Sequence, residues 1–324
     1  MLEVFQGLRI EGVACALPGR TMEVGAFAER FGEETVARFR QVVGVERFHV
    51  AGPNQRASDL AEAAARRLMG AGRLNPDEVD VLLFVTQTPD AVAPATSATL
   101  QARLGLGTHL FALDLNQGCA GFLAGLLTAT HFLQSPTVRK VLLLGGDTLT
   151  RCLDPNDHTA AMLFGDAGFA ALIGKGGDDT WTFASATEAS DAITLPHGGT
   201  FHMKGTDVFN FTVTRVPEQI QHVLAAPGPA PDLLLLHQAN AFIVRQVARL
   251  CRFPAERAPC RIAHRGNTSC ASLPLLLCDL AEEGLAGAHP ALLSAFGVGL
   301  TWLTARMNVD FGVCLPPLIL PETP

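Results

Sequence analysis

Residues 110–133 read LFALDLNQGCAGFLAGLLTATHFL, which is a short apolar run, a polar turn and a longer apolar stretch. Residues 110–115 have the length and the aliphatic content of a buried strand. Residues 119–133 carry apolar side chains at spacings of three and four, which predicts a helix, and residues 116–118 supply the turn between the two. A strand that turns into a helix is the unit from which layered α/β folds are built, so this stretch predicts an α/β fold.

The same alternation of β-rich runs and helical patterns extends along the chain and falls into two halves. The second half restarts near Trp181, after the glycine-rich residues 174–179. We therefore expect an N-terminal half over residues 1–174 and a C-terminal half over residues 175–324. The further expected strands are residues 80–86, 138–145 and 232–236, and the further expected helices are residues 57–71, 95–104, 239–250 and 272–283.

The composition describes a large folded protein. The chain has 324 residues, of which 48% are hydrophobic and 17% are charged, a balance typical of compact globular chains. Its formal net charge of −7 gives no general attraction for nucleic acid or anionic membranes, so neither partner is expected. The first residues lack the cationic start and apolar run of an export signal, which predicts a cytoplasmic protein.

The eight cysteines form no CxxC pair and show no zinc-ligand spacing. A chain of this length hardly needs disulfides, so we expect reduced thiols, no metal and no cofactor. The most apolar segment, residues 118–133, is short for a membrane span and contains His131, so we expect it in the core. Walker loops, G-x-S-x-G elbows and HExxH zinc motifs are all missing.

Cys119 stands where the expected strand turns into the expected helix. A thiol there lies at the positive end of the helix dipole, beside unpaired backbone N–H groups, which would lower its pKa and favour the thiolate. Its neighbours Gly118, Ala120 and Gly121 are small and leave room for a substrate to approach the sulfur. Free cysteine is also among the most buried residue types, so its position alone leaves an inert core thiol open.

Two polar residues of the second half are further candidates. His237 follows four leucines at the exit of an expected strand, where it could donate a hydrogen bond to a thioester carbonyl or act as a base. Asn267 lies in the polar turn RGNTSCAS, where an asparagine is usually a cap or a turn former. Either residue alone reads as structural, and only their combination with Cys119 makes them candidates.

Cysteine, histidine and asparagine in this chain order also occur in papain-like proteases. There the cysteine belongs to a C-G-[SA]-C-[WY] motif near the mature N-terminus. Here Cys119 follows a buried run in the middle of the chain, so the context argues against a protease.

Three segments together resemble the signature segments of ketoacyl-ACP synthase III, a family of the thiolase superfamily: DLNQGCAGF around Cys119, HQAN from His237 and RGNTS around Asn267. DPND with LFGDAG over residues 154–168, and AFGVGLTW over residues 295–302, add to the similarity. The resemblance implies a thiolase-like α/β fold of two related halves in a layered αβαβα arrangement. It also implies a homodimer.

The resemblance implies a role for each site residue. Cys119 would take an acyl group from a thioester, either acyl-CoA or acyl carrier protein, and hold it as an acyl-enzyme. His237 and Asn267 would hydrogen-bond the carbonyl of a malonyl-type thioester and stabilise the enolate that forms as carbon dioxide leaves. The backbone N–H groups of Cys119 and Val298 would form the oxyanion hole.

The departures from the family pattern gather where the family binds its carriers, so we expect an unusual member. The tryptophan and arginine that clasp adenine in the family align with Arg38 and Val42. The arginine that follows the DPxD run is His158 here. Much of the cationic contact with phosphopantetheine carriers is therefore missing.

The face on which the family docks its carriers also differs. The basic residues that follow the family's phenylalanine, here Phe209, and its HQAN-Leu segment become Asn210 and Phe242. On this side the expected substrate-binding residues are His158, Phe209, Asn240 and Phe242.

A further expected substrate-binding residue is Ala93, just before Pro94. In the family a bulky residue at this place reaches across the dimer and caps the partner's acyl pocket. We hypothesise that the smaller Ala93 admits an acyl group longer or bulkier than acetyl. Val298, where the family has a glycine, keeps the backbone donor but narrows the site, which opposes that effect.

The sequence leaves three functions open. The first is condensation of the acyl group on Cys119 with a malonyl-type or β-keto thioester in fatty acid or specialised, polyketide-type metabolism. The second passes the same acyl group to a hydroxyl or amine of a small molecule, with His237 as base. The third is a noncatalytic partner subunit, which retention of Cys119, His237 and Asn267 argues against.

Overall fold

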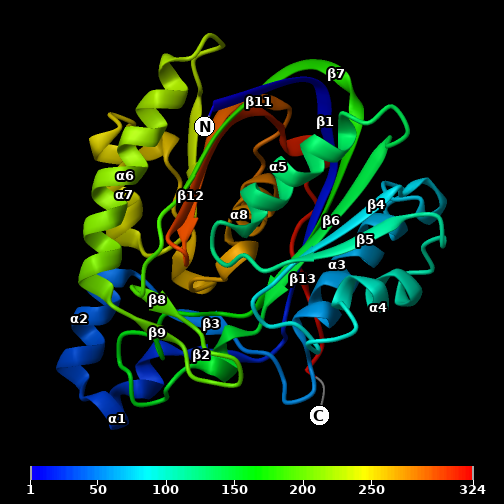
Figure 1. Ribbon diagram of the computed structural model, residues 1–324. Helices are drawn as coiled ribbons and strands as arrows, with labels where there is room; N and C mark the ends of the chain where they lie inside the picture. The colour runs from blue at the N-terminus through cyan, green and yellow to red at the C-terminus, as the bar shows by residue number, and fades with distance from the viewer. Residues whose placement is uncertain (1, 323–324) are drawn as a thin grey trace.

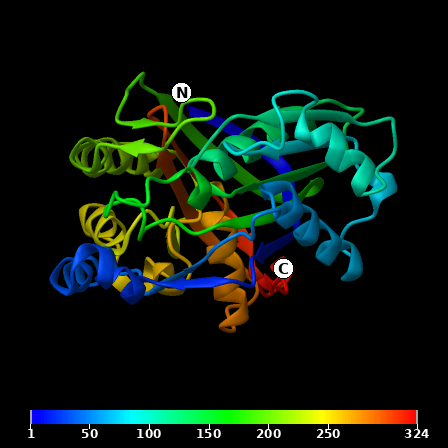
Figure 2. The ribbon, with the colours of Figure 1, turned by 90° about the horizontal axis from the view of Figure 1, so that it is seen from below.

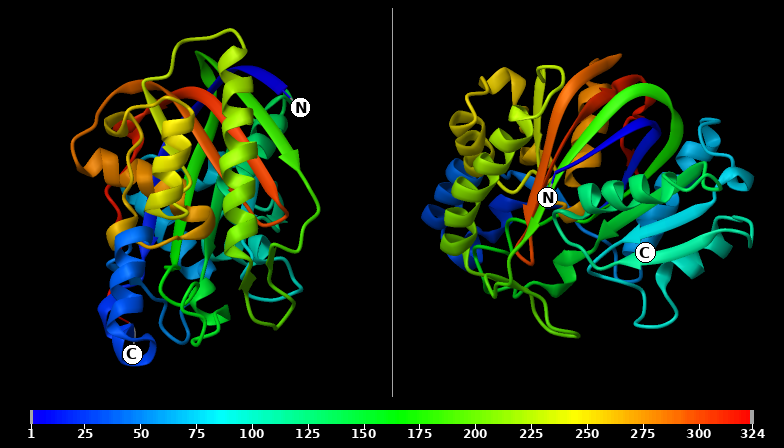
Figure 3. Two further views of the ribbon diagram at one scale, coloured as in Figure 1. Left: turned by 90° about the vertical axis from the view of Figure 1, so that its left-hand side faces the viewer. Right: turned by 45° about the horizontal axis from the view of Figure 1, so that its top comes forward.

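Two long strands run through the whole molecule and join its parts. The computed structural model describes residues 2–322, in which β1 (Leu2–Leu17) pairs antiparallel with β7 (Ala167–Thr187). Both strands curve over the top of the molecule in Figure 1, and the right-hand view of Figure 3 shows the bend from above. The other main strands are β4 (Val81–Val85), β5 (Phe111–Leu115), β6 (Lys140–Asp147), β10 (Leu233–Leu236), β11 (Ala288–Gly297) and β12 (Thr301–Asp310). Their order is β10-β11-β12-β7-β6-β4-β5, with β1 beside β7.

Helices cover both outer faces of this folded sheet, and two more fill the space inside it. The central pair is α5 (Gly121–Leu133) and α8 (Ser272–Glu282). One outer layer holds α3 (Ala57–Gly70) and α4 (Thr96–Arg103), and the other holds α6 (Gly205–Ala225) and α7 (Ala241–Leu250). Figure 2 shows the same succession from below. The five layers agree with the expected αβαβα arrangement.

The alternation of side chains along the strands explains the layers. On β4, Leu83 faces the central helices, while Leu82 and Phe84 pack under α3 and α4. On β10, Leu235 faces the central helices, while Leu234 packs under α6 and α7. Because successive strand residues point to opposite faces, a strand covered on both sides must be apolar at every position.

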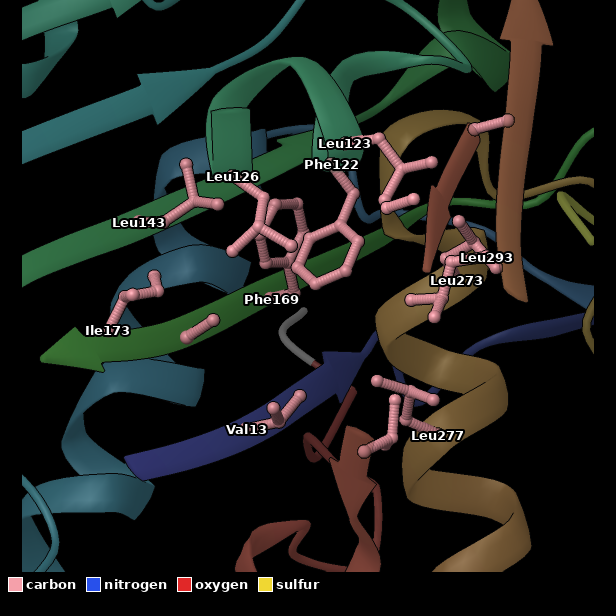
Figure 4. Close-up of a cluster of buried hydrophobic side chains, with 14 of the residues drawn as sticks. Val13, Phe122, Leu123, Leu126, Leu143, Phe169, Ile173, Leu273, Leu277 and Leu293 are labelled. Atoms are coloured by element: carbon pink, nitrogen blue, oxygen red, sulfur yellow. The ribbon is translucent and has the colours of Figure 1, made fainter. Parts of the chain in front are cut away.

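The apolar stretch that ends at Leu133 lies in the central layer, as predicted. Figure 4 shows Phe122 and Leu126 of α5 beside Phe169, with Leu277 of α8 in the same buried cluster. The ring of Phe122 packs edge-on against Phe169 of β7, with 5.4 Å between the ring centroids. This dense packing holds α5, and the turn before it, in a fixed place.

The structure confirms the strands and helices expected from the sequence, with ends shifted by a few residues. α5 begins at Gly121 and not at Cys119, because the N–H of Gly121 bonds to the carbonyl of Gly118 in a turn, at 2.7 Å. The structure also contains β1, β7, β11, β12 and α6, which the sequence did not predict.

The predicted boundary between the halves falls inside β7. Residues 174–179 lie within this strand and not between two elements, because β1 pairs with it on either side of the glycines. The division into two halves therefore stays a prediction. Residue 1 of the predicted N-terminal half and residues 323 and 324 of the predicted C-terminal half lie outside the described residues.

No helix between residues 2 and 322 is long and apolar enough to cross a membrane. Several smaller elements complete the fold. These elements are α1 (Ala28–Phe31), α2 (Glu33–Val43), β2 (Thr21–Glu23), β3 (Arg47–His49), β8 (Ile193–Thr194), β9 (His202–Met203) and β13 (Leu318–Ile319).

Buried thiols make the fold sensitive to alkaline pH. Burial raises the pKa of Cys251, just after α7, to about 12 from an ordinary value of 9.0. As the pH rises above that ordinary value, the unfolded chain loses the thiol proton while the folded chain keeps it, so stability falls with rising pH. At about pH 10.5 this one thiol should lower the free energy of unfolding by about 2 kcal/mol.

Urea unfolding of wild type and Cys251→Ala at about pH 8 and about pH 10.5 checks this expectation. The variant has no thiol to ionise at this position, so its loss of stability over that range should be smaller by about 2 kcal/mol. Equal losses in the two proteins would contradict the assignment.

Candidate active site

One cavity of about 350 Å³ is lined by Cys119, His237 and Asn267 together. Cys119 lies in the turn between β5 and α5, His237 directly follows β10, and Asn267 lies in the loop before α8. The segments meet because α5 and α8 share the central layer and begin at the same end of it. Residues that are far apart in the sequence therefore face one space.

Two glycines allow the backbone to pack closely around Cys119. A Cβ atom on Gly297, at the end of β11, would lie 2.7 Å from Cβ and 3.3 Å from Sγ of Cys119. A Cβ atom on Gly118 would lie 2.8 Å from Cγ1 of Val298 and closer still to Gln87. Real Cβ atoms do not approach this closely, so a side chain at residue 297 would displace Cys119 itself. At residue 118 it would displace the ends of the Gln87 and Val298 side chains.

The Gly297→Ala variant is expected to acylate Cys119 at least about 100-fold more slowly, because a shift of the sulfur by even 1 Å can cost this much. The rate of adduct formation with an acyl-CoA, followed by intact-protein mass, measures the effect. Gly70→Ala is the matched control, since a Cβ atom there meets nothing within 4 Å. A Gly297→Ala protein that acylates as fast as this control would show that the contact does not constrain the thiol.

The thiol of Cys119 is protonated, contrary to expectation. Burial raises its pKa to about 12, the Ser269 hydroxyl acts against this shift, and the Asp147 carboxylate acts in the same direction as burial. The predicted lowering by the helix dipole is therefore wrong, because the removal of water outweighs the positive end of α5. A reaction through this sulfur would require a nearby group that takes its proton.

His237 is a neutral imidazole with one nitrogen occupied. Burial lowers the pKa of His237 to about 3. Its Nδ1 lies 2.6 Å from Oγ of Ser272, the first residue of α8, and its ring packs edge-on against Phe296. Nε2 is then the nitrogen available to a substrate. When Ser272 donates its proton to Nδ1, Nε2 carries the hydrogen and acts as a donor.

The side-chain amide of Asn267 has a defined orientation. Its Oδ1 accepts the backbone N–H of Ser269 at 3.0 Å, and a backbone N–H can only donate. The amide nitrogen therefore points the other way, as a donor. The backbone of Asn267 is fixed as well, since its N–H donates to Leu163 at 2.8 Å and its carbonyl accepts from Gly165 at 3.0 Å. His237 and Asn267 can thus offer two N–H donors to one oxygen in the cavity.

Val298 lines the same cavity, next to Gly297. The Cβ position of Gly297 lies 3.4 Å from the backbone nitrogen of Cys119, so the chain at residues 297–298 approaches that nitrogen closely. This geometry is compatible with the predicted oxyanion hole, which stays a prediction.

Three of the expected substrate-binding residues line the cavity, namely Phe209, Asn240 and Phe242. The rings of Phe209 and Phe242 stack with 5.5 Å between their centroids, and Phe242 is 37% exposed. Asn240 caps α7, because its side-chain oxygen accepts the N–H of Ile243 at 2.7 Å. The solvent side of the cavity is therefore aromatic.

The other two expected residues, Ala93 and His158, do not line this cavity in the described part of the chain. Ala93 is exposed in the loop between β4 and α4. His158 is exposed and contacts the ring of Phe31.

Beyond Phe242, a shallow hollow is lined by Arg38 and Val42 of α2 together with Arg245 of α7. Arg245 places a second cation there, which the alignment of Arg38 and Val42 did not predict.

The sequence analysis did not identify three polar residues that lie at the site. Ser269 Oγ lies 3.9 Å from Cys119 Sγ, Ser272 holds His237, and Asp147 is buried behind Cys119 at the end of β6. Serine at a helix start and aspartate at a strand end are common, so spacing alone does not mark them. Within residues 2–322, no three His, Cys, Asp or Glu side chains gather to hold a metal ion.

Comparison with known proteins gives a consistent result. Residues 113–192 match the family 3-oxoacyl-[acyl-carrier-protein (ACP)] synthase III, and residues 230–309 match its C-terminal domain. A beta-ketoacyl-[acyl-carrier-protein] synthase III of Streptomyces coelicolor is 35% identical over 92% of this chain and 96% of its own.

Solved structures show the same relationship. A 3-oxoacyl-(acyl-carrier protein) synthase from Burkholderia xenovorans superposes with a TM-score of 0.94 at 32% identity, over 99% of both chains. The priming beta-ketosynthase of a polyketide biosynthetic pathway superposes with a TM-score of 0.82 at 26% identity, over 95% of this chain and 96% of its own. These likenesses confirm the expected thiolase-like fold.

Proposed function

Because the chain belongs to the 3-oxoacyl-[acyl-carrier-protein] synthase III family, we propose that it joins an acyl group held on Cys119 to a malonyl-type or β-keto thioester. As a member of this family it is a condensing, acyl-transferring enzyme. Cys119 receives the acyl group, and His237 and Asn267 hold the carbonyl of the second thioester. For a malonyl-type thioester, carbon dioxide leaves and the resulting enolate attacks the acyl carbon.

The observation that carries this proposal is the pair of N–H donors beside a thiol. Decarboxylation places negative charge on the thioester oxygen, and two fixed donors stabilise that charge without a base. The backbone N–H of Ser269 donates to Oδ1 of Asn267, which leaves the amide nitrogen of Asn267 as one donor. A proton donated by Ser272 to Nδ1 of His237 leaves Nε2–H as the other donor.

The electrostatics of His237 favour condensation over transfer to a hydroxyl or amine. That second reaction needs a base, and an imidazole whose pKa is lowered to about 3 takes a proton weakly. Hydrogen-bond donation needs only the neutral ring. We therefore place condensation first, in fatty acid biosynthesis, with a polyketide-type pathway as the alternative setting.

The proposal includes a cytoplasmic homodimer that takes acyl-CoA or acyl carrier protein thioesters. The edge strand β5 supports the dimer, because Phe111 on it is 53% exposed and an edge strand leaves backbone groups unpaired. Ala93 then meets the partner subunit, and we propose that its small side chain admits acyl groups longer than acetyl.

A condensation assay tests the proposal. The purified protein is given acyl-CoAs of graded length with either malonyl-CoA or a malonyl-loaded carrier protein, and the products are identified by mass. A β-ketoacyl thioester with release of carbon dioxide is expected. Acyl transfer to added alcohols or amines without such a product would support the alternative, and strict acetyl preference would contradict the assignment of Ala93.

A further inference from the structure

A buried carboxylate lies behind Cys119 with no cation beside it. Asp147 is 1% exposed and takes part in no ion pair among residues 2–322. By contrast Asp279, which is 6% exposed, pairs with Arg265 at 2.8 Å. A buried carboxylate without a partner charge destabilises a fold, and such groups occur preferentially at functional sites.

The hydrogen bonds of Asp147 all reach the same oxygen. Its Oδ1 accepts from the backbone N–H of Gln87 at 2.7 Å and from the hydroxyls of Thr86 and Thr88 at 3.1 and 3.4 Å. Its Oδ2 is buried and has no hydrogen-bond partner within the described part of the chain. Asp166, a second buried carboxylate, uses both of its oxygens. Asp147 therefore keeps one oxygen without a close hydrogen bond, and both the Ser269 hydroxyl and the Cys270 thiol lower the pKa of its carboxyl.

Ser269 connects this acceptor to the nucleophile. Its hydroxyl lies 3.9 Å from Cys119 Sγ, and the short helix that it begins packs against β6, whose last residue is Asp147. The same hydroxyl lowers the pKa of the Asp147 carboxyl. Its φ is +50°, in the left-handed region that favours glycine, and its N–H is bonded to Asn267. A serine stays in such a conformation only where its surroundings hold it. Catalytic hydrogen bonds of this length commonly shorten once substrate is bound.

The first half-reaction requires a proton acceptor near the sulfur. The pKa of the Cys119 thiol is raised to about 12, so the thiol keeps its proton at neutral pH. The pKa of His237 is lowered to about 3, so its imidazole is a weak base. Burial raises the pKa of Asp147 above the ordinary carboxyl value, which makes it a better acceptor than an exposed carboxylate.

We propose that Asp147 takes the proton of Cys119 through the hydroxyl of Ser269 during acylation, which rests on the proposed function of Cys119. Sγ bonds to the thioester carbonyl carbon as its proton passes to Ser269 Oγ and the Ser269 proton passes to Asp147. The tetrahedral intermediate then collapses, and the bond from carbon to the carrier sulfur breaks. The electron pair stays on that sulfur. Asp147 returns its proton to Ser269 Oγ, the Ser269 hydroxyl donates a proton to the carrier sulfur, and the carrier leaves as a thiol.

A purely electrostatic role for Asp147 predicts the opposite result. Its negative charge raises the pKa of Cys119, so removing the charge would increase the thiolate fraction and speed acylation at neutral pH. Removing a proton acceptor slows acylation instead, typically by about 100-fold or more. The sign of the effect therefore separates the two roles.

The test measures the rate of acyl-enzyme formation from an acyl-CoA at neutral pH by quenching and intact-protein mass. Asp147→Asn and Ser269→Gly are each expected to be about 100-fold slower than wild type, and the double variant no slower than the slower single variant. The wild-type rate should fall in D₂O, and the variants should lose this dependence. Asp166→Asn, the matched buried carboxylate, should acylate at the wild-type rate.

Thermal unfolding separates a proton role from a structural one. Glycine suits a φ of +50°, so Ser269→Gly should be at least as stable as wild type while it acylates slowly. This variant decides the question if Asp147→Asn does not fold. Acylation of either variant at or above the wild-type rate would overturn the proposal. A wild-type protein that forms no adduct would instead contradict the proposed function, and the relay with it.

Discussion

Replacing Cys119 with alanine is expected to abolish acyl-enzyme formation and to slow condensation by at least about ten-thousand-fold. Among the described residues, Cys119 contributes the one thiol that lines the cavity, so no other sulfur there can hold the acyl group. Decarboxylation of a malonyl thioester should persist in this variant, because its donors, His237 and Asn267, remain. Separate assays of adduct, carbon dioxide and β-ketoacyl product measure the three effects.

Cys152→Ala is the control for this experiment. Cys152 is a half-buried thiol outside the cavity, so its loss should leave all three readouts unchanged. Condensation by Cys119→Ala at near the wild-type rate would show that the acyl group is held elsewhere or is never covalently bound.

Changing Asn267 to aspartate is expected to slow condensation by about 100-fold to 1000-fold while acylation changes little. Aspartate keeps the oxygen that accepts the N–H of Ser269 at 3.0 Å, so the local structure should survive. It replaces the N–H donor with a charged oxygen, which repels the developing enolate. His237→Ala should have a comparable effect on condensation, because it removes the other donor to the same oxygen.

Rates of acylation and of condensation, measured separately on each variant, test this division of labour. Variants that lose acylation as strongly as condensation would show that His237 and Asn267 act in the first step. Condensation by Asn267→Asp at the wild-type rate would show that the amide donor is not used.

The fold could be predicted mainly where strands and helices are buried on all sides. The run from Val81 to Val85 faces α5 on one side and α3 on the other, so every residue is apolar and the strand is easy to recognise. β1 and β7 were missed or divided because their outer parts mix polar residues and glycines. Their continuity comes from pairing with each other across the whole molecule, which a local pattern does not contain.

The site shows a similar contrast. Cys119, His237 and Asn267 could be named because each stands at the end of a strand or in the turn before a helix, within segments that resemble one family. The residues that act on them could not, since Asp147 and Ser269 meet only when β6 and the loop before α8 come together. The ionisation of Cys119 was mispredicted for the same reason: the helix dipole is visible in sequence, whereas burial is a property of the folded molecule.

The most direct test is intact-protein mass spectrometry of the wild type after incubation with acyl-CoAs and acyl-loaded carrier protein, followed by peptide mapping. We predict an adduct with the mass of the acyl group, located on Cys119 and released by the addition of a malonyl thioester. An acyl group mapped to another residue, or no adduct with any donor in a folded protein, would contradict the account.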